Sequence, residues 1–392
     1  MCWRRLESPP ERDRLNAPMI ESLHIAGFKL FRDLTLPKLG RMNLFFGENN
    51  TGKSCLLEAV GIYASHNPIT DILYIASLRS QGEIRPWEPR GGSNEQGTSL
   101  RHPVFDLFRR DGPMGDPDAK SSILIEQIGD SDSLRLEDQL RDIMINTDGS
   151  RTVSPIARDG QEEIGFGELA RVLAVYRGNK SVALITRRSA LPSVWRLHAQ
   201  KQANEDVPAI AHVPANGLSD EVAASLWDSL IQGPGQERVL SWLRVIDSRI
   251  EALDFVAGRL KERIALLKIE GEGRIPLRSM GDGLRRMFHI GLAMSTASKG
   301  ILLIDEFENG LHWRVQRELW AALAKAAKEF EVQIFATTHS RDCIGGFVSA
   351  SKELGIEDAT LYRLEREGDE IYAVNLALVN VEDALEVNGE VR

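Results

Sequence analysis

The sequence predicts an α/β fold in which short buried strands alternate with helices. Three apolar runs, at 42–46, 301–304 and 332–336, each stop at a glycine or a polar residue. Such runs are typical of strands in a parallel sheet, because both faces of these strands are covered. Between the last two runs, apolar residues recur at helical spacing from Leu311 to Ala326, which predicts the helix that joins two parallel strands.

Length and composition narrow the class of protein. The chain has 392 residues, 42% of them hydrophobic and 27% charged, and a formal net charge of −9. These values exclude a wholly disordered chain, and no apolar run approaches the ~18 residues of a membrane span. Because its three cysteines are scattered and it begins without an apolar leader, we expect a cytoplasmic protein with no membrane partner. The acidic charge argues against a chain-wide DNA surface but leaves a local one possible.

The patterns divide the chain into four parts. Residues 1–18 are polar and aperiodic, so we expect a disordered extension, with a partner-binding tail as the alternative. The segments 19–75 and 266–392 carry the clear strand and helix patterns, and we expect them to form two halves of one domain. The signals between them are weaker. Apolar spacing suggests helices there, so we expect 76–265 to be a large, mostly helical insertion.

A glycine-rich stretch between the first apolar run and a helical pattern has the spacing of a phosphate-binding loop, G-x-x-x-x-G-K-[ST]. With the residue after it, the stretch reads Gly47, Glu48, Asn49, Asn50, Thr51, Gly52, Lys53, Ser54 and Cys55. Backbone N–H groups of such a loop curl around phosphates, and the helix N-terminus adds partial positive charge. We expect Lys53 to reach the β- and γ-phosphates and the Ser54 hydroxyl to bind Mg²⁺.

Polar residues at the ends of the other two apolar runs complete a candidate site. We expect Asp305 to hold the water shell of Mg²⁺ and Glu306 to polarise the attacking water as general base. His339 follows the run at 332–336. Since ligands gather at the carboxyl ends of parallel strands, we expect His339 to hydrogen-bond the γ-phosphate and report its presence.

A third segment gains its meaning from its position in the chain. Ser279, Gly281 and Asp282 precede a helical pattern, and a helix N-terminus favours anions. Any capped helix can have this composition. Its place in the chain gives the segment its meaning, because it lies between the phosphate loop and the Asp305–Glu306 pair.

The order of these motifs resembles that of ABC-type ATPase heads, a class of P-loop NTPase. The spellings Ile-Asp-Glu-Phe-Glu-Asn-Gly-Leu-His at 304–312 and Ala-Thr-Thr-His-Ser at 336–340 are similar to the OLD-like and RecF/SMC-like branch. The resemblance covers 19–65 and 270–345, about a third of the chain by density of motifs. Met280 departs from transporter-type signatures, which have glycine there.

The resemblance implies a mixed sheet flanked by helices and a homo-oligomer in which two heads sandwich two ATP molecules. The signature residues Ser279, Gly281 and Asp282 of one head would then face, in trans, the ATP at the phosphate loop of the other. We therefore expect a slow, Mg²⁺-dependent ATPase whose nucleotide state gates DNA or a partner effector. The expected role is anti-phage defence or DNA surveillance and repair.

OLD nucleases carry a Toprim domain after the ATPase. Because only 53 residues follow His339, we expect no such domain here and a separate effector encoded nearby. Two alternatives stay open: the nucleotide-binding subunit of an ABC transporter, and an ATP-dependent scaffold that does not hydrolyse.

Other residues allow two interpretations. Arg285 and Arg286 could contact DNA or the partner's nucleotide, but an exposed charged helix face is the commoner case. Cys55 could be a redox switch, although we favour helix packing. Gln81 is a candidate for the glutamine that such heads carry before the signature. We expect residues 312–313 to pack against the partner subunit.

Overall fold

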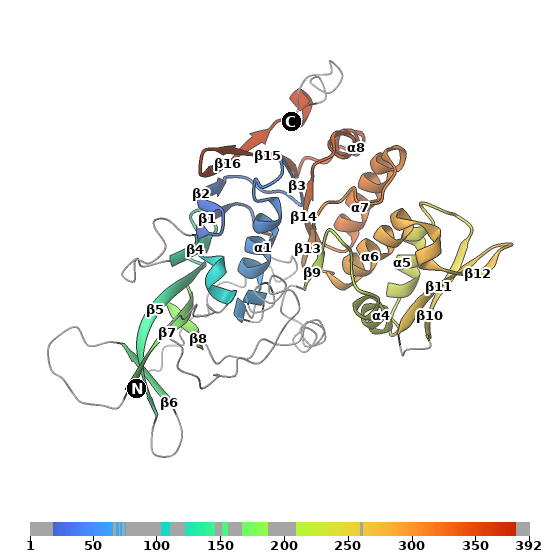
Figure 1. Cartoon of the computed structure of the whole chain (residues 1–392). Coiled ribbons are helices and arrows are strands. Elements are labelled where there is room, and N and C mark those ends of the chain that lie inside the picture. The colour runs from blue at the N-terminus through green and yellow to red at the C-terminus, as the bar shows by residue number, and fades with distance from the viewer. Residues whose placement is uncertain are drawn as a thin grey trace, which may run out of the picture.

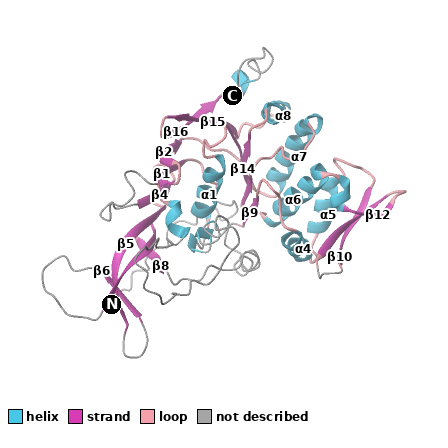
Figure 2. Ribbon diagram, viewed as in Figure 1, coloured by secondary structure: helices cyan, strands magenta, loops and turns pink. Residues whose placement is uncertain are grey.

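A computed structural model describes residues 19–65, 68–69, 71–72, 75, 103–109, 122–145, 151–155, 167–186, 209–258 and 262–381. The predicted extension 1–18 and Gln81 lie outside these residues. Three sheets organise the described chain (Figure 1), and helices cover the central sheet on both faces (Figure 2). In the part of the chain that is described, no helix is both long and apolar enough to cross a bilayer.

The central sheet has six strands in the order β16-β15-β3-β14-β13-β9. All neighbours are parallel except the terminal hairpin of β15 and β16, so the sheet is mixed, as the resemblance to ABC-type ATPase heads implies. Its strands are β3 (Met42–Phe46), β9 (Ile210–Val213), β13 (Ile301–Ile304), β14 (Gln333–Thr338), β15 (Ala359–Glu367) and β16 (Glu370–Leu376).

Side chains of each central strand alternate between two hydrophobic cores. On β13, Ile301 and Leu303 join the core that contains α1 (Lys53–Ala64), whereas Leu302 and Ile304 join the opposite core. Burial of each such side chain stabilises the fold by about 1.5–3 kcal/mol. The helices of the opposite core are α4 (Asp220–Ser229), α5 (Gly235–Leu243), α6 (Asp282–Thr296), α7 (Gln316–Glu329) and α8 (Arg341–Glu353).

The second sheet is antiparallel and has seven strands. It combines two strands from the start of the described chain with strands from the segment 76–265. Its strands are β1 (Leu23–Phe28), β2 (Phe31–Leu36), β4 (Ser122–Glu126), β5 (Ser133–Ile145), β6 (Arg151–Pro155), β7 (Gly167–Arg177) and β8 (Lys180–Thr186). A short 3₁₀ helix, η1 (Pro103–Leu107), precedes β4.

In the residues that the structure describes, the segment 76–265 is not the mostly helical insertion that the sequence predicts. The described residues of this segment are mostly strand, with α4 and α5 as its α-helices there. On β5, Leu134 and Leu136 are buried and alternate with charged residues, which is the period of a strand rather than a helix. A third, three-stranded sheet spans the end of the segment, with β10 (Ile250–Ala257), β11 (Arg263–Ile269) and β12 (Gly273–Pro276).

Strand β9 also lies within 76–265, yet it pairs with β13 in the central sheet. Part of the segment therefore belongs to the domain that it interrupts. This position matters for the site, because the loop after β9 carries the carbonyl groups of Pro214 and Ala215 beside the end of β13.

Candidate functional site

The three sequence-predicted site segments meet at one edge of the central sheet. The phosphate loop follows β3, the pair Asp305–Glu306 follows β13, and His339 follows β14. These three strands are adjacent and parallel. We call the end of β13 that carries Asp305 and Glu306 the acidic edge. Ser54 Oγ donates a hydrogen bond to Asp305 Oδ2 at 2.8 Å. The predicted magnesium ligands, 251 residues apart in sequence, are therefore in direct contact.

The phosphate loop requires glycine at two positions. Gly52 has a φ of +88°, and a Cβ atom there would lie 2.8 Å from the Phe31 ring. At Gly47 a Cβ atom would lie 2.4 Å from the carbonyl oxygen of Leu364. Helix α1 begins at Lys53, the seventh residue of the motif. The N-terminal N–H groups of the helix therefore face the glycine-rich part of the loop, as an anion site needs.

Lys53 closes the loop on itself. Its Nζ donates to the carbonyl oxygens of Gly47 at 2.9 Å and Glu48 at 2.8 Å. Burial lowers the pKa of Lys53, while the carboxylates of the acidic edge, Glu306 first, act in the opposite direction. This cation, drawn partly out of water, is suited to bind a phosphate.

A threonine from β14 holds both acidic residues. Thr337 Oγ1 donates to Asp305 Oδ1 at 2.6 Å and accepts the backbone N–H of Glu306 at 2.8 Å. Glu306 has a φ of +52°, in the left-handed region that non-glycine residues rarely adopt. Strain of this kind concentrates at functional sites, where surrounding contacts enforce it.

Arg286 also holds the backbone of Asp305 and Glu306 in place. Its side chain is buried, and its guanidinium donates to the carbonyl oxygens of Asp305, Glu306, Pro214 and Ala215. Burial lowers its pKa to about 10. The interpretation of this residue as part of an exposed helix face is therefore wrong, because α6 turns it inward onto the acidic edge.

The candidate general base is itself hydrogen-bonded. Asn309 Nδ2 donates to Glu306 Oε2 at 2.6 Å and to the carbonyl oxygen of Ala215 at 3.2 Å. One oxygen of Glu306 therefore already accepts a hydrogen bond from an amide group.

His339 contacts Glu308, an acidic residue outside the Asp305–Glu306 pair. Glu308 Oε1 accepts the backbone N–H of His339 at 2.9 Å and lies 3.0 Å from His339 Nδ1. The His339 side chain is half exposed, so its ring is fixed at one edge and open to a ligand at the other.

The signature-like residues lie at the start of α6. Ser279 belongs to a 3₁₀ turn, η3 (Leu277–Met280), Gly281 has a φ of +90°, and Asp282 is the first residue of α6. All three are exposed. Next to them is a polar cleft of about 210 Å³, lined by Ala215, Asn216, Gly217, Asp282, Arg285, Arg286, His289, Asn309 and Gly310.

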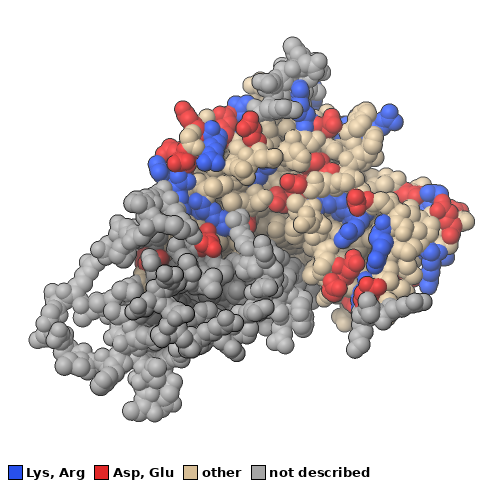
Figure 3. Space-filling view, viewed as in Figure 1, with Lys and Arg blue, Asp and Glu red and all other residues tan. Residues whose placement is uncertain are grey.

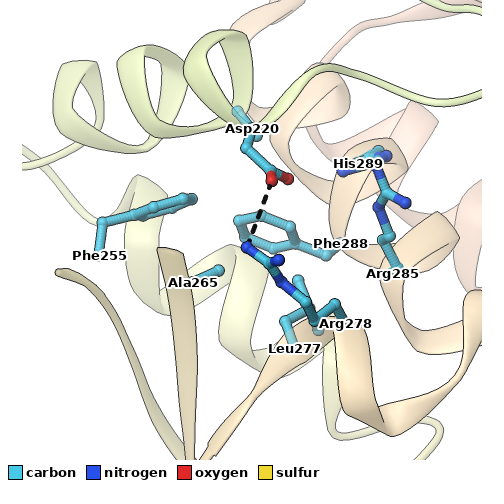
Figure 4. A pocket seen from close by; sticks show the side chains of 9 residues that line it. Asp220, Phe255, Ala265, Leu277, Arg278, Arg285, Phe288 and His289 are labelled. Atoms are coloured by element: carbon cyan, nitrogen blue, oxygen red, sulfur yellow. Dashed lines mark ion pairs between the residues drawn. The ribbon is translucent and has the colours of Figure 1, made fainter. Parts of the chain in front are cut away.

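The cleft lies between the start of α6 and the loop that follows the Asp305–Glu306 pair. Gly310, in the loop that follows the acidic pair, lies against Asp282, where a Cβ atom on Gly310 would be 2.8 Å from Asp282 Cβ. A second cavity lies between α4, α6 and the third sheet, and the Asp220–Arg278 ion pair spans part of its lining (Figure 4). Because its volume is only about 20 Å³, it is a packing gap with room for little more than one water.

The donor set of the main site fits Mg²⁺. A hydroxyl and a carboxylate oxygen, those of Ser54 and Asp305, lie together, and Mg²⁺ prefers few protein oxygens supplemented by water and phosphate. Among the described residues no group of three or more His, Cys, Asp or Glu side chains could hold a metal, as the all-protein cage of other ions would require.

On the face shown in Figure 3, acidic and basic side chains are interspersed.

Sequence reasoning did not find four supporting residues, namely Thr337, Glu308, Asn309 and, in its buried role, Arg286. Three of them stand inside the stretches 304–312 and 336–340, so proximity to Asp305 and His339 was a usable signal. Arg286 left no such signal in the sequence, because its partners are main-chain carbonyl groups.

Comparison with known proteins agrees with this geometry. The family described as "AAA domain, putative AbiEii toxin, Type IV TA system" matches residues 42–342. A Helicobacter pylori protein named "ATP/GTP phosphatase" is 24% identical over 346 residues, 83% of this chain and 86% of its own. An uncharacterized protein of Methanocaldococcus jannaschii is 38% identical over 90 residues, 23% of this chain and 36% of its own.

Among solved structures, the Smc head bound to the C-winged helix domain of ScpA has a TM-score of 0.52 at 11% identity. The similarity covers 93% of this chain and 99% of that one. At this identity the likeness concerns the fold alone. It confirms the predicted P-loop NTPase fold, with a mixed sheet flanked by helices.

Proposed function

This chain belongs to the AAA domain family that matches residues 42–342, and on that premise we propose that it binds ATP with Mg²⁺ and hydrolyses it. The observation that carries the proposal is the contact between Ser54 and Asp305, which joins the phosphate loop to the acidic edge. The name of the Helicobacter pylori relative, an ATP/GTP phosphatase, supports nucleoside triphosphate hydrolysis.

Each site residue then has one task. Backbone N–H groups of the loop residues Gly47–Ser54, with Cys55 behind them, receive the phosphates, and Lys53 moves from the loop carbonyls to the β- and γ-phosphates. Ser54 and Asp305 hold Mg²⁺, which neutralises developing charge on the phosphates. Glu306 takes the proton of the attacking water, and His339 binds the γ-phosphate.

We further propose that two copies of this chain act together. The exposed Ser279, Gly281 and Asp282 are placed at a helix N-terminus, and the cleft beside them is also lined by the loop that follows the acidic pair. In a homodimer these residues contact the ATP of the other head. Trp313, which is 57% exposed beside the acidic edge, is then covered by the partner copy.

The biological role that we propose is an ATP-dependent gate for a separate effector protein or DNA, in bacterial defence or DNA surveillance and repair. The spellings at 304–312 and 336–340, similar to the OLD-like and RecF/SMC-like branch, and the toxin–antitoxin wording of the family description support this role. In this role the protein works in the cytoplasm.

One observation favours a second candidate, an ATP-dependent scaffold that does not hydrolyse. Asn309 Nδ2 donates to Glu306 Oε2, one of the two oxygens that could accept the water's proton. If this contact persisted with ATP bound, binding would occur without turnover.

A Glu306→Gln variant separates the two functions. We expect wild-type turnover of ATP with Mg²⁺ to exceed that of the variant by about 100-fold or more, because a general base contributes 10²–10⁴-fold. Glu318→Gln, an exposed position on α7, is the matched control and should turn over ATP like wild type. Equal, slow turnover by wild type and Glu306→Gln would leave only the scaffold.

The same variant tests the dimer. Glu306→Gln traps bound ATP, so light scattering with ATP and Mg²⁺ should show a doubling of mass that ADP does not produce. An unchanged monomer under these conditions would contradict the sandwich of two heads.

A further inference from the structure

The surroundings of His339 determine which ring nitrogen carries a proton. Nδ1 lies 3.0 Å from Glu308 Oε1, which also accepts the backbone N–H of His339. An unprotonated Nδ1 at this distance would set its lone pair against the carboxylate oxygen, so the contact favours a proton on Nδ1. Because the ring is half exposed, Nε2 is the nitrogen that a ligand can reach.

Glu308 is unusual in its own right. Its side chain is 8% exposed, and its Oε2 is buried without a hydrogen-bond partner among the described residues. Burying a carboxylate that is only partly hydrogen-bonded costs stability, and such costs are commonly found where function requires them. The cations Lys53 and Arg286 interact with Glu308 as well as with Asp305 and Glu306. On α8, burial and then the charge of Glu308 raise the pKa of the Cys343 thiol.

We propose that Glu308 is a positioning residue that fixes the protonation of His339 and thereby enables the head to distinguish ATP from ADP. This inference rests on the proposed ATP site. An ionised γ-phosphate offers only acceptor oxygens, so Nε2 must donate to it. With Nδ1 already protonated toward Glu308, His339 binds the γ-phosphate as an imidazolium whose charge Glu308 balances. ADP has no γ-phosphate, so a proton on Nε2 would form no hydrogen bond to the nucleotide there.

The first test observes the ring directly. In the full chain labelled with ¹⁵N-histidine, the signal of His339 is the one that a His339→Gln variant lacks. We expect Nδ1 to be protonated without nucleotide and with ADP. With ATP and Mg²⁺ in the Glu306→Gln variant, both nitrogens should be protonated. A bare Nδ1 in the free protein, or a single proton with ATP bound, would overturn the proposal whether or not a Glu308 variant folds.

The second test removes the charge of Glu308. In Glu308→Gln we expect the ratio of the ADP and ATP dissociation constants to fall about tenfold or more, as in His339→Ala, because a charge-assisted hydrogen bond is weakened. The affinity for ADP should stay within about twofold of wild type. The matched control is Glu353→Gln, on an exposed α8 side chain, and it should preserve the ratio.

The outcomes separate this inference from the function on which it rests. If Glu308→Gln keeps the wild-type ratio while His339→Ala loses it, Glu308 has no positioning role. If wild type binds ATP no better than ADP and does not hydrolyse it, the ATP site itself is contradicted.

Discussion

The two sides of the candidate site are held together by different kinds of contact. The phosphate loop is closed by its own residues, with Thr51 bound to the carbonyl of Glu48 and Lys53 to that of Gly47. The acidic edge depends on distant elements: Thr337 holds the backbone of Glu306 from 31 residues away, and Arg286 reaches it from α6. The loop is thus a local structure, whereas the edge is a product of tertiary packing.

The strongest way to break the edge while leaving the loop intact is Arg286→Met. The substitution removes the guanidinium that donates to four partly buried main-chain carbonyl groups, including those of Asp305 and Glu306. The carbonyls of Pro214, Ala215 and Glu306 keep one other donor, from Gly217 or Asn309. We expect a loss of about 3 kcal/mol in the free energy of unfolding. ATP turnover should fall far more than ATP affinity. Urea unfolding and steady-state kinetics check both.

Arg285→Met is the matched control, since the neighbouring side chain lies in the cleft and is only partly buried. It should change the free energy of unfolding by less than about 1 kcal/mol. Equal effects of the two substitutions would show that Arg286 has no special role at the edge.

This difference between the two sides explains what the sequence could predict. Eight contiguous residues identify the phosphate loop, and apolar runs identify β3, β13 and β14, because burial on both faces leaves a clear pattern. The contact between Ser54 and Asp305 followed from parallel strands ending at one edge.

The remaining features left weak signals or none. Strand β9 is as short as β13, but His212 interrupts its apolar run, and the strands of the second sheet mix apolar with charged residues. Arg286 binds main-chain carbonyls, which any sequence supplies, so its burial could not be predicted. The pairing of Glu308 with His339 depends on how two loops meet, which no spacing encodes.

A pH experiment sharpens the comparison on α6. His289 is buried there, and its Nδ1 accepts the backbone N–H of Leu218. Burial lowers its pKa from 6.5 to about 3. Between these values the unfolded chain binds a proton that the folded chain does not, so stability falls as pH falls. From pH 7.5 to 5 this group costs about 2 kcal/mol.

Urea unfolding at the two pH values measures that loss. In His289→Gln, which cannot gain the proton, the loss between pH 7.5 and 5 should be smaller than in wild type by about the same 2 kcal/mol. An identical pH dependence in the two proteins would show that His289 does not contribute to acid sensitivity.

The smallest expected effect is on the loop side. Gly52→Ala combines a left-handed φ with a Cβ atom 2.8 Å from the Phe31 ring, whereas Gly271→Ala has a similar φ but no atom within 4 Å. We expect Gly271→Ala to cost about 1 kcal/mol of stability and Gly52→Ala about 1–2 kcal/mol, with weaker ATP binding only in the latter. Thermal unfolding and ATP titration check this pair. Equal ATP affinities would contradict the close fit at Gly52.

The central claim is that the loop and the edge hold one Mg²⁺–nucleotide together through Ser54 and Asp305. The most direct measurement is a double-mutant cycle on Mg²⁺-dependent ATP affinity with Ser54→Ala, Asp305→Asn and both together. If the two side chains hold the same ion, each single variant loses most of the gain in affinity from Mg²⁺, and the double variant loses little more. Losses that simply add would show two independent sites and contradict the account.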